Sequence, residues 1–364
     1  MNVINVSLEG KGSASYQIGI GYDIADGIGR ILAEKQLGAR YAIISDSSVS
    51  PLHGEAFLKK LHDAGLNVSL MEFPAGEHSK NINTVLDIAA RMLASGVDRK
   101  CALIALGGGV VGDIVGFIAS VYMRSLPYIQ VPTTLVGQVD SSIGGKTAID
   151  LREGKNLLGT FYQPSAVFID LKFLETLPER EFNNGLAEII KYGIIDDEGL
   201  FGLLEKEMPA VKKRKGGFPE HIVERCCRIK KNLVEIDERD QGIRHFLNFG
   251  HTIGHAIEAA SEYAFTHGEA ISLGMKAAAR ISGRLHGLPL QDRERIENLI
   301  SQAGLPTRLP ERIATDDIIA RLKTDKKKDG DTIHFVFLHK IGSPLINGGV
   351  TEAVVRETIE GLRK

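Results

Sequence analysis

The sequence is poor in cysteine and has no tryptophan: its 364 residues include three Cys and no Trp. Cys101, Cys226 and Cys227 are too few for a disulfide framework, and the adjacent pair lacks the Cys-x-x-Cys spacing of a zinc thiolate site. The apolar run at 101–112 is much shorter than the roughly 20 residues that span a bilayer. The first ten residues lack the basic and apolar regions of a secretory signal, so we expect a cytoplasmic protein.

An excess of charge of either sign is also absent. Lys and Arg total 44 and Asp and Glu total 46, which gives a formal net charge of −2. This balance argues against a protein whose whole surface binds nucleic acid or an anionic membrane. The hydrophobic and charged fractions, 43% and 25%, are those of an ordinary globular enzyme or scaffold, and the length suits two domains.

Glycine is over-represented, with 40 residues, about 11% of the chain against a usual 7% or so. These glycines form neither a collagen-like period nor a Ser/Pro-rich linker. Ordered glycines occur at tight turns and where a backbone approaches a ligand closely. We therefore expect several of them to mark a binding site.

The first half of the chain alternates apolar β-rich runs with helical patterns. Such alternation predicts a parallel sheet covered on both faces, as in α/β nucleotide-binding domains. The predicted strands are 41–46, 68–73, 101–106, 128–131 and 166–169, and the predicted helices are 55–64 and 84–95.

After about residue 178 helical periodicity dominates. The expected helices are 222–235, 251–261, 269–286 and 296–303, with one strand-like segment at 333–338. We therefore expect an N-terminal Rossmann-like α/β domain over residues 1–177. A mainly α-helical domain over residues 178–364 would follow it.

A glycine-rich loop follows the predicted strand 101–106. Gly107, Gly108, Gly109 and Gly112 satisfy G-x-G-x-x-G, a pattern that lets backbone N–H groups approach a pyrophosphate at a helix N-terminus. The loop follows roughly the third predicted strand, and no acidic residue occurs about 20 positions later, so it is not the usual dinucleotide fingerprint. The alternatives are a phosphate-binding loop and a purely structural turn.

Two lysines are flanked by glycines further along. Gly144-Gly145-Lys146-Thr147 lacks the earlier glycine of a Walker loop, because Asp140 occupies that position. Gly154-Lys155-Asn156 follows soon after. Together the two segments suggest an anion site, whereas the alternative is a pair of exposed lysines.

Three histidines lie within 17 residues: His251, His255 and His267. His251 and His255 share one helix face, although Thr252 replaces the glutamate of the HExxH zinc motif. Glu188, a charge among apolar neighbours, is the best candidate for a carboxylate ligand of the same metal. Catalytic zinc sites commonly combine three such ligands with one open position. The alternative for any single histidine is a hydrogen-bonded core residue.

Taken in order, these motifs resemble the 3-dehydroquinate synthase family of sugar-phosphate cyclases over nearly the whole chain. The matching segments are Gly107–Val110 with Asp113, Val131–Thr134, Gln138–Ser142, Gly144–Lys146, Gly154–Asn156, Leu186–Gly193, Leu247–His255 and His267–Glu269. Three positions depart from the family pattern: Ser125, Gly137 and Asp240 stand where Gly, Ala and Glu are usual.

The resemblance implies one divalent metal, Zn²⁺ or Co²⁺, and NAD bound in a cleft between the domains. The positions that match the metal ligands are Glu188, His251 and His267, whereas His255 matches an active-site residue. The positions that match NAD-binding residues are Asp46, Glu77, Lys80, Gly108, Gly109, Val110, Asp113, Thr133, Thr134, Lys146, Lys155, Phe173, Leu174, Glu175 and Thr176. The positions that match catalytic or substrate-binding residues are Arg124, Asp140, Lys146, Lys155, Asn156, Lys191, Lys230, Arg244, Asn248, His255 and one of Lys326 and Lys327.

The implied reaction converts 3-deoxy-D-arabino-heptulosonate 7-phosphate to 3-dehydroquinate and phosphate, a lyase step of the shikimate pathway toward chorismate and the aromatic amino acids. It proceeds by transient oxidation, phosphate elimination, re-reduction, ring opening and an intramolecular aldol closure. The resemblance also implies a homodimer, because the residue at position 124 reaches a neighbouring subunit's site. The alternatives are another sugar-phosphate cyclase, a metal-dependent polyol dehydrogenase of the same superfamily, and a non-catalytic nucleotide-binding scaffold.

Overall fold

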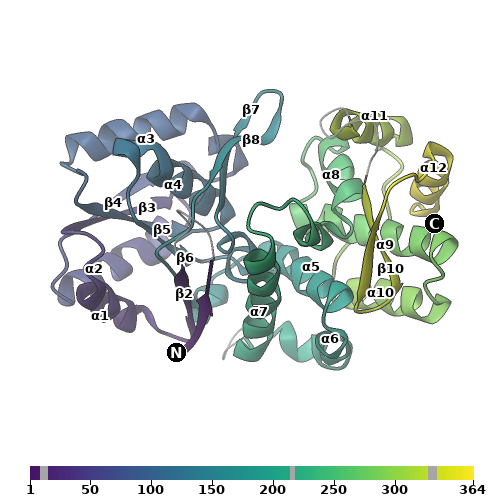
Figure 1. The fold of residues 1–364 in the computed structure, drawn as a ribbon, viewed down its shortest axis with the longest axis horizontal. Helices are drawn as coiled ribbons and strands as arrows, with labels where there is room; N and C mark the ends of the chain where they lie inside the picture. Colours follow the sequence, from purple (N-terminus) through teal and green to yellow (C-terminus); the bar gives the residue numbers. More distant parts are fainter. Residues whose placement is uncertain (9–14, 214–217, 327–333) are drawn as a thin grey trace. The chain divides into compact units, whose positions relative to one another are not determined.

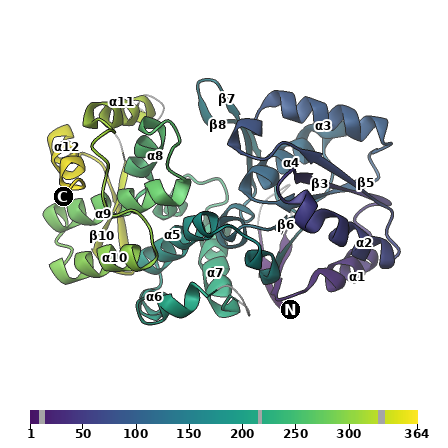
Figure 2. The ribbon, with the colours of Figure 1, turned by 180° about the vertical axis from the view of Figure 1, so that it is seen from behind.

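Contacts divide the chain into two units in the computed structural model, which describes residues 1–8, 15–213, 218–326 and 334–364. The first unit comprises Met1–Leu177 and Arg214–Arg239, and the second comprises Pro178–Lys213 and Asp240–Lys364. Figures 1 and 2 show the ribbon from two opposite sides. No helix in the described ranges combines the length and the apolar character that a membrane crossing requires.

A seven-stranded sheet forms the centre of the first unit, in the order β1-β2-β9-β6-β5-β3-β4. All its pairings are parallel except that of β1 with β2. The strands are β1 (Asn2–Val6), β2 (Tyr16–Gly21), β3 (Arg40–Asp46), β4 (Val68–Phe73), β5 (Cys101–Gly107), β6 (Tyr128–Pro132) and β9 (Ala166–Asp170). The expected Rossmann-like parallel sheet is confirmed.

Helices cover both faces of this sheet, because its central strands are apolar at successive positions. Along β3, Tyr41 and Ile43 belong to the core cluster shared with α1 (Ala25–Lys35) and α2 (Glu55–Asp63). Ala42 and Ile44 belong to the opposite cluster, shared with α3 (Ile82–Ala94) and α4 (Gly109–Val121). Figure 1 shows these two helix pairs on either side of the strands.

A hairpin of β7 (Lys146–Leu151) and β8 (Gly154–Phe161) accompanies the sheet and contacts α4. Lys146 and the segment Gly154–Asn156, expected in anion-binding loops, therefore lie in paired strands, whereas Gly144 and Gly145 precede β7. The glycine-rich loop follows the fifth strand of the chain, not roughly the third, because the expectation omitted β1 and β2.

Helix α7 (Glu220–Ile236) packs against β1, β2 and the short helix η4 (Gly137–Ser141) of the first unit. Glu220 accepts a hydrogen bond from Asn2 Nδ2 at 2.8 Å, and Glu235 accepts one from the Ser7 backbone N at 2.6 Å. The sequence predicted a single domain boundary after residue 177, whereas the structure groups α7 with the first unit. The reason is that the buried face of α7 packs against apolar residues of that unit.

The second unit is mainly helical. Its core consists of buried aliphatic and aromatic residues such as Ile257, Leu273 and Phe337, which come from four of its helices and a small hairpin. The elements are α5 (Glu179–Ile195), α6 (Glu198–Val211), η6 (Ile243–Asn248), α8 (His251–Ala260), α9 (His267–Leu285), α10 (Leu290–Gln302), α11 (Thr315–Lys326), β10 (Phe335–Lys340), β11 (Ser343–Asn347) and α12 (Glu352–Gly361).

Candidate functional site

Helix α5 buries a carboxylate in the second unit. Residues 185–195 of this helix are all buried, so it is surrounded by protein on every side. Glu188 is 0% exposed, and Lys191, one turn later, is 1% exposed. Lys191 Nζ forms an ion pair with Glu188 Oε2. A buried carboxylate needs such a partner because desolvation penalises an isolated charge.

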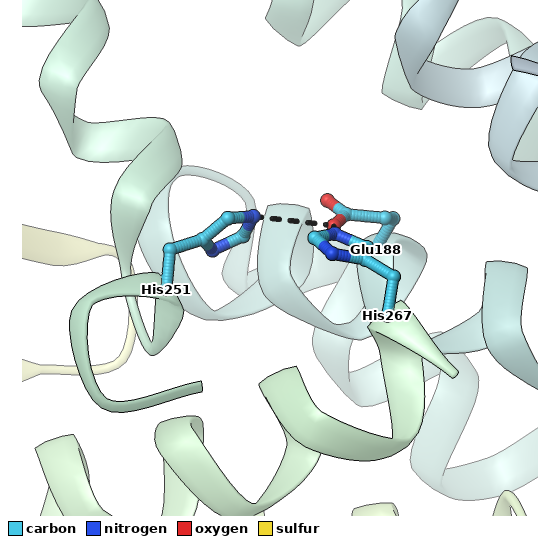
Figure 3. Close-up of side chains that lie close together, drawn as sticks. All are labelled: Glu188, His251 and His267. Carbon is cyan, nitrogen blue, oxygen red and sulfur yellow. Dashed lines mark hydrogen bonds and ion pairs between the residues drawn. The ribbon is translucent and has the colours of Figure 1, made fainter. Parts of the chain in front are cut away.

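Two histidines face Glu188 from the first residues of two other helices, as Figure 3 shows. His251 begins α8 after Gly250, which has a φ of 78°, and its Nε2 lies 3.4 Å from Glu188 Oε1. His267 begins α9, and its Nε2 lies 3.0 Å from the same oxygen. One potential ligand atom from each of the three residues lies within 4.8 Å of the others.

The electrostatics of this cluster follow from burial and close pairing. Burial alone would raise the pKa of Glu188, but Lys191 and the two histidines hold it well below its usual value. Burial would also lower the pKa of His267, but its pairing with the Glu188 and Glu258 carboxylates raises it to about 9. Burial and the nearby Lys191 ammonium lower the pKa of His251. A divalent cation bound by the two histidines would displace a proton from them and would itself supply positive charge beside Glu188.

The donor chemistry of Glu188, His251 and His267 fits Zn²⁺ or Co²⁺. Two imidazoles and one carboxylate form a common three-ligand set for catalytic zinc, and imidazole also suits neighbouring transition metals. His251 Nδ1 lies 3.1 Å from the Phe249 carbonyl oxygen, so a proton on Nδ1 leaves the Nε2 lone pair toward Glu188. The arrangement can therefore hold a cation through one carboxylate oxygen and two Nε2 atoms.

His255 lies next to this set. Its ring centroid is 5.2 Å from that of His251 and 5.7 Å from that of His267. With Glu258 and His267 it forms a second group that could hold a metal, while its own side chain remains exposed. The His251–His255 pair expected from spacing is thus close in space. However, the buried carboxylate faces His251 and His267.

In the first unit, the glycine-rich loop joins β5 to α4 as expected. Gly108 is the N-cap of α4, and Gly109 is its first residue. A Cβ on Gly107 would lie 2.4 Å from Val111 Cγ2, and one on Gly108 would lie 2.9 Å from Thr134 Cγ2. The protein's own packing therefore already requires these two glycines. Thr133 adjoins the loop, where its backbone N donates to the Gly107 carbonyl at 2.9 Å.

Expected cofactor and substrate residues meet around one buried lysine. Lys80 Nζ lies 2.6 Å from Asp113 Oδ2 and donates to Asn156 Oδ1 at 2.5 Å. Burial would lower the pKa of Lys80, but Asp113 and Glu77 raise it. Lys155 Nζ lies 3.3 Å from Glu77 Oε1. The hairpin β7–β8 thus brings Lys155 and Asn156 to the residues around the start of α4.

A second pair joins residues 90 positions apart. Lys230 of α7 donates to Asp140 Oδ1 and to the Asp140 carbonyl oxygen, both at 2.7 Å. Both residues were expected to contact substrate, but the sequence placed Lys230 in the C-terminal domain. The structure groups it with the first unit because α7 packs on η4.

The remaining expected residues are distributed over both units. Asp46 ends β3 and accepts from the backbone N of Ser48 and Val49. Phe173, Leu174 and Glu175 lie in η5 (Leu171–Glu175), with Thr176 at its C-cap. Three further residues that were expected in the site, Val110, Arg124 and Lys146, also belong to the first unit.

In the second unit, Arg244 lies in η6 and is 2% exposed. Asn248 is the last residue of η6 and is exposed. Lys326 ends α11, and Lys327 lies outside the described residues.

Sequence reasoning missed two residues beside these sites. Glu258 lies 3.7 Å from His267, and it follows His251 by seven positions, which places both on one face of α8. That spacing was a usable signal. His53 donates to or accepts from Thr176 Oγ1 at 2.7 Å, and its ring lies 4.8 Å from that of Phe173. No sequence pattern indicated this contact.

This chain is similar in sequence to known proteins over nearly its whole length. Family models described as 3-dehydroquinate synthase N-terminal and C-terminal match residues 70–184 and 185–328. A 3-dehydroquinate synthase of Desulforamulus reducens is 46% identical over 97% of this chain and 98% of its own length.

Two solved structures resemble the fold with a TM-score of 0.89. One is a 2-deoxy-scyllo-inosose synthase complexed with carbaglucose-6-phosphate, NAD⁺ and Co²⁺, which is 27% identical and covers 99% of this chain and 100% of its own. The other is the 2-epi-5-epi-valiolone synthase of Streptomyces hygroscopicus subsp. jinggangensis with NAD⁺ and Zn²⁺ bound. It is 29% identical and covers 98% of this chain and 99% of its own.

Proposed function

Because this chain belongs to the 3-dehydroquinate synthase family, we propose that it converts 3-deoxy-D-arabino-heptulosonate 7-phosphate to 3-dehydroquinate and phosphate. The observation that carries the proposal is the 46% identity over nearly the full length of a 3-dehydroquinate synthase. The buried Glu188, which faces two histidines, supports the metal chemistry that the family name implies.

The proposed metal ligands are Glu188, His251 and His267. A divalent cation held there would supply a Lewis acid that makes a nearby substrate hydroxyl more acidic. Lys191 holds the Glu188 carboxylate through its ion pair, and the Phe249 carbonyl orients His251. These neighbours keep the ligand atoms in place before the cation arrives, which reduces the reorganisation that binding requires.

The proposed NAD-binding residues lie in the first unit, where the loop after β5 and the Lys80 cluster approach each other. NAD supplies a hydride acceptor that is regenerated within each turnover. Lys80 is held by Asp113 and Asn156, and Lys155 is held by Glu77. The structural neighbours with NAD⁺ bound support this assignment.

The proposed substrate carries a carboxylate and a phosphate, so several fixed cations and amide donors suit it. The candidates are Arg124, Lys146, Lys155, Lys191, Lys230, Arg244, Asn156, Asn248 and one of Lys326 and Lys327. Asp140 holds Lys230 Nζ through two hydrogen bonds and so fixes the position of this ammonium group. His255, whose side chain is exposed, offers a proton relay to solvent.

The decisive experiment measures phosphate release from the heptulosonate phosphate with NAD and Zn²⁺ or Co²⁺, before and after chelation. We expect release that stops on chelation and returns with added metal. NADH should not accumulate, because the reduced cofactor is reoxidised in the same turnover. A folded, metal-loaded protein that releases no phosphate would overturn the proposal.

The ligand assignment predicts that Glu188→Gln and His251→Ala lower bound metal. Each change removes one donor, and elemental analysis after dialysis measures the loss. His245→Ala is a matched control, since His245 Nε2 donates to the Asp240 carbonyl oxygen and is not in either candidate metal group among the described residues. Unchanged metal content in both ligand variants would contradict the assignment.

A second candidate function is another sugar-phosphate cyclase, favoured by the two cyclase structures that share the fold. Product identification by mass spectrometry after incubation with a hexose or heptose phosphate distinguishes it from the proposed activity. A polyol dehydrogenase would instead accumulate NADH during turnover, visible as near-ultraviolet absorbance.

We also propose that the chain is a homodimer of the cytoplasm. The basis is the resemblance to the 3-dehydroquinate synthase family, including the match at Arg124. Light scattering on the eluting protein measures its mass in solution, and a monomer at micromolar concentration would contradict the dimer. Fractionation of cells tests the location.

A further inference from the structure

His267 faces a carboxylate on each side of its ring. Its Nε2 lies 3.0 Å from Glu188 Oε1, and its Nδ1 lies 3.7 Å from Glu258 Oε2. Glu258 is 7% exposed and comes from α8, whereas Glu188 comes from α5. Two buried carboxylates on one imidazole need an explanation, because burying each of them costs free energy.

We propose that Glu258 is a positioning residue for His267: it keeps a proton on Nδ1 and so leaves the Nε2 lone pair for a divalent cation shared with Glu188 and His251. The inference rests on the metal site of the proposed function and adds a fourth side chain to it. Glu258 would not touch the cation itself.

The argument starts from the two tautomers of a neutral imidazole. The single proton can occupy either ring nitrogen, and the nitrogen without it is the one that can bind a metal. A hydrogen-bond acceptor beside Nδ1 favours the tautomer whose lone pair is on Nε2. His251 already shows this arrangement, because its Nδ1 lies 3.1 Å from the Phe249 carbonyl oxygen. Glu258 provides His267 with the corresponding acceptor.

The same residues define a rival arrangement, in which His255, Glu258 and His267 hold the cation. A neutral His267 offers only one lone pair, so the two groups compete for it. Three observations favour the Glu188 group: Glu188 is fully buried, it lies closer to His267 than Glu258 does, and it faces His251 as well. Glu258 is then left to face Nδ1.

The distance of 3.7 Å is that of an ion pair and exceeds the 2.7–3.2 Å of a direct hydrogen bond. Each of the two carboxylates faces a different nitrogen of the His267 ring. A cation that replaces the Nε2 proton would leave Nδ1–H as the one remaining donor of the ring. Its strongest acceptor within reach would be Glu258.

The test measures the affinity of the full-length protein for Zn²⁺ by competition with a chromophoric chelator. Glu258→Ala removes the acceptor, and we expect Kd to rise about 10- to 100-fold. Glu258→Gln keeps a neutral acceptor of the same size, so we expect a smaller rise. Binding should still saturate at one ion per chain in both variants. The matched control is Glu294→Gln, the same change at an exposed position of α10, with Kd unchanged.

A second readout follows the Nδ1–H proton of His267 by NMR in zinc-loaded protein labelled at histidine nitrogen. We expect this proton to resonate downfield and exchange slowly in the wild-type protein, and to exchange faster in Glu258→Ala. If Glu258→Ala unfolds, the Gln variant carries the same comparison, because it preserves the side-chain volume.

Wild-type Kd in both Glu258 variants would overturn this inference while leaving the metal site intact. Loss of binding in Glu258→Ala and His255→Ala, with normal binding in Glu188→Gln, would overturn it in favour of the rival group. A wild-type chain that binds no Zn²⁺ or Co²⁺ would overturn both this inference and the metal site of the proposed function.

Discussion

At the scale of single residues, three consecutive backbone conformations near Arg124 are unusual. Met123, Arg124 and Ser125 have φ angles of 48°, 70° and 100°, in a region that favours glycine. Ser125 combines its φ with a ψ of 139°. It is also the position where the family pattern has glycine, so the departure noticed in the sequence coincides with a strained residue.

Replacing Ser125 by Gly should therefore stabilise the protein. Glycine adopts this conformation without Cβ strain, and we expect a gain of up to about 1 kcal/mol in the free energy of unfolding. Urea unfolding measures the change. Ser120→Gly is the control with the opposite sign, since the Ser120 hydroxyl, near the end of α4, donates to the Phe117 carbonyl and accepts from Thr160, and glycine would lose both hydrogen bonds. A destabilised Ser125→Gly would show that the serine hydroxyl outweighs the strain.

The glycine excess also has a residue-scale explanation that differs from the expectation. Several glycines expected at ligand-binding backbone are required by the chain's own packing. A Cβ on Gly107 would meet Val111 at 2.4 Å, and one on Gly268 would meet the Asn184 carbonyl oxygen at 2.3 Å. Sequence cannot separate these two uses of glycine, because both require the absence of a side chain.

At the scale of elements, the crossing of α8 and α9 sets the separation of His251 and His267. The helices approach so closely that a Cβ on Gly274 would lie 1.9 Å from the Gly250 carbonyl oxygen and 2.7 Å from the Gly254 N. Both histidines are first residues of these helices. The geometry of the candidate metal site therefore depends on Gly274, the eighth residue of α9.

We predict that Gly274→Ala destabilises the second unit by about 2–3 kcal/mol or more, because backbone atoms cannot move aside for a methyl group. It should also weaken Zn²⁺ binding by separating the two histidines. Thermal unfolding and chelator competition measure these effects. In Gly283→Ala, on the same helix, the new Cβ would have no neighbour closer than 3.5 Å, so neutral or improved stability is expected. Equal stability of the two variants would refute the prediction.

The start of α9 also carries a pH-dependent contribution. Glu269 closes a capping box with Thr266 and pairs with Arg180 of α5. Burial would raise the pKa of Glu269, but Arg180 and the cap hold it below its usual value. A carboxylate whose pKa is lower in the folded state stabilises above its unfolded pKa, and this stabilisation is lost as pH falls through the folded value.

We therefore expect wild-type stability to exceed that of Glu269→Gln at pH 7, and the difference to shrink below about pH 4.5. Unfolding in urea at several pH values measures this. Glu357→Gln is a suitable control, because Glu357 lies in α12 and pairs with Arg284 at the exposed surface, where an ion pair contributes little to stability. A difference that does not vary with pH would indicate that Glu269 acts only through packing.

At the scale of the whole molecule, each unit has its own hydrophobic core. Two clusters flank the sheet of the first unit, and a third joins the helices of the second. The candidate metal ligands all belong to the second unit, and the glycine-rich loop with the Lys80 cluster belongs to the first. A ligand that binds to one unit should therefore change hydrogen exchange mainly within that unit.

Removal of the metal should increase hydrogen exchange most in the peptides of α5, α8 and the start of α9. Their carboxylate and imidazoles would lose the cation that links them, and binding to the native state alone stabilises it. Exchange in β3 and β5 should change least. Mass spectrometry with and without chelator measures this, and a uniform increase over both units would contradict the assignment of the metal to the second.

The sequence alone determined the fold class, five of the seven strands of the sheet and the loop at Gly107, and its family resemblance predicted Glu188, His251 and His267 as metal ligands. These depend on local periodicity and on motifs whose order can be read directly. Only the tertiary structure grouped α7 with the sheet, paired Lys230 with Asp140 and placed Glu258 beside His267. Each of these depends on which face of one element packs on another, and contacts across up to 90 residues leave no local pattern. The few cysteines and the near-zero charge excluded whole classes of protein, but the site itself arose from packing.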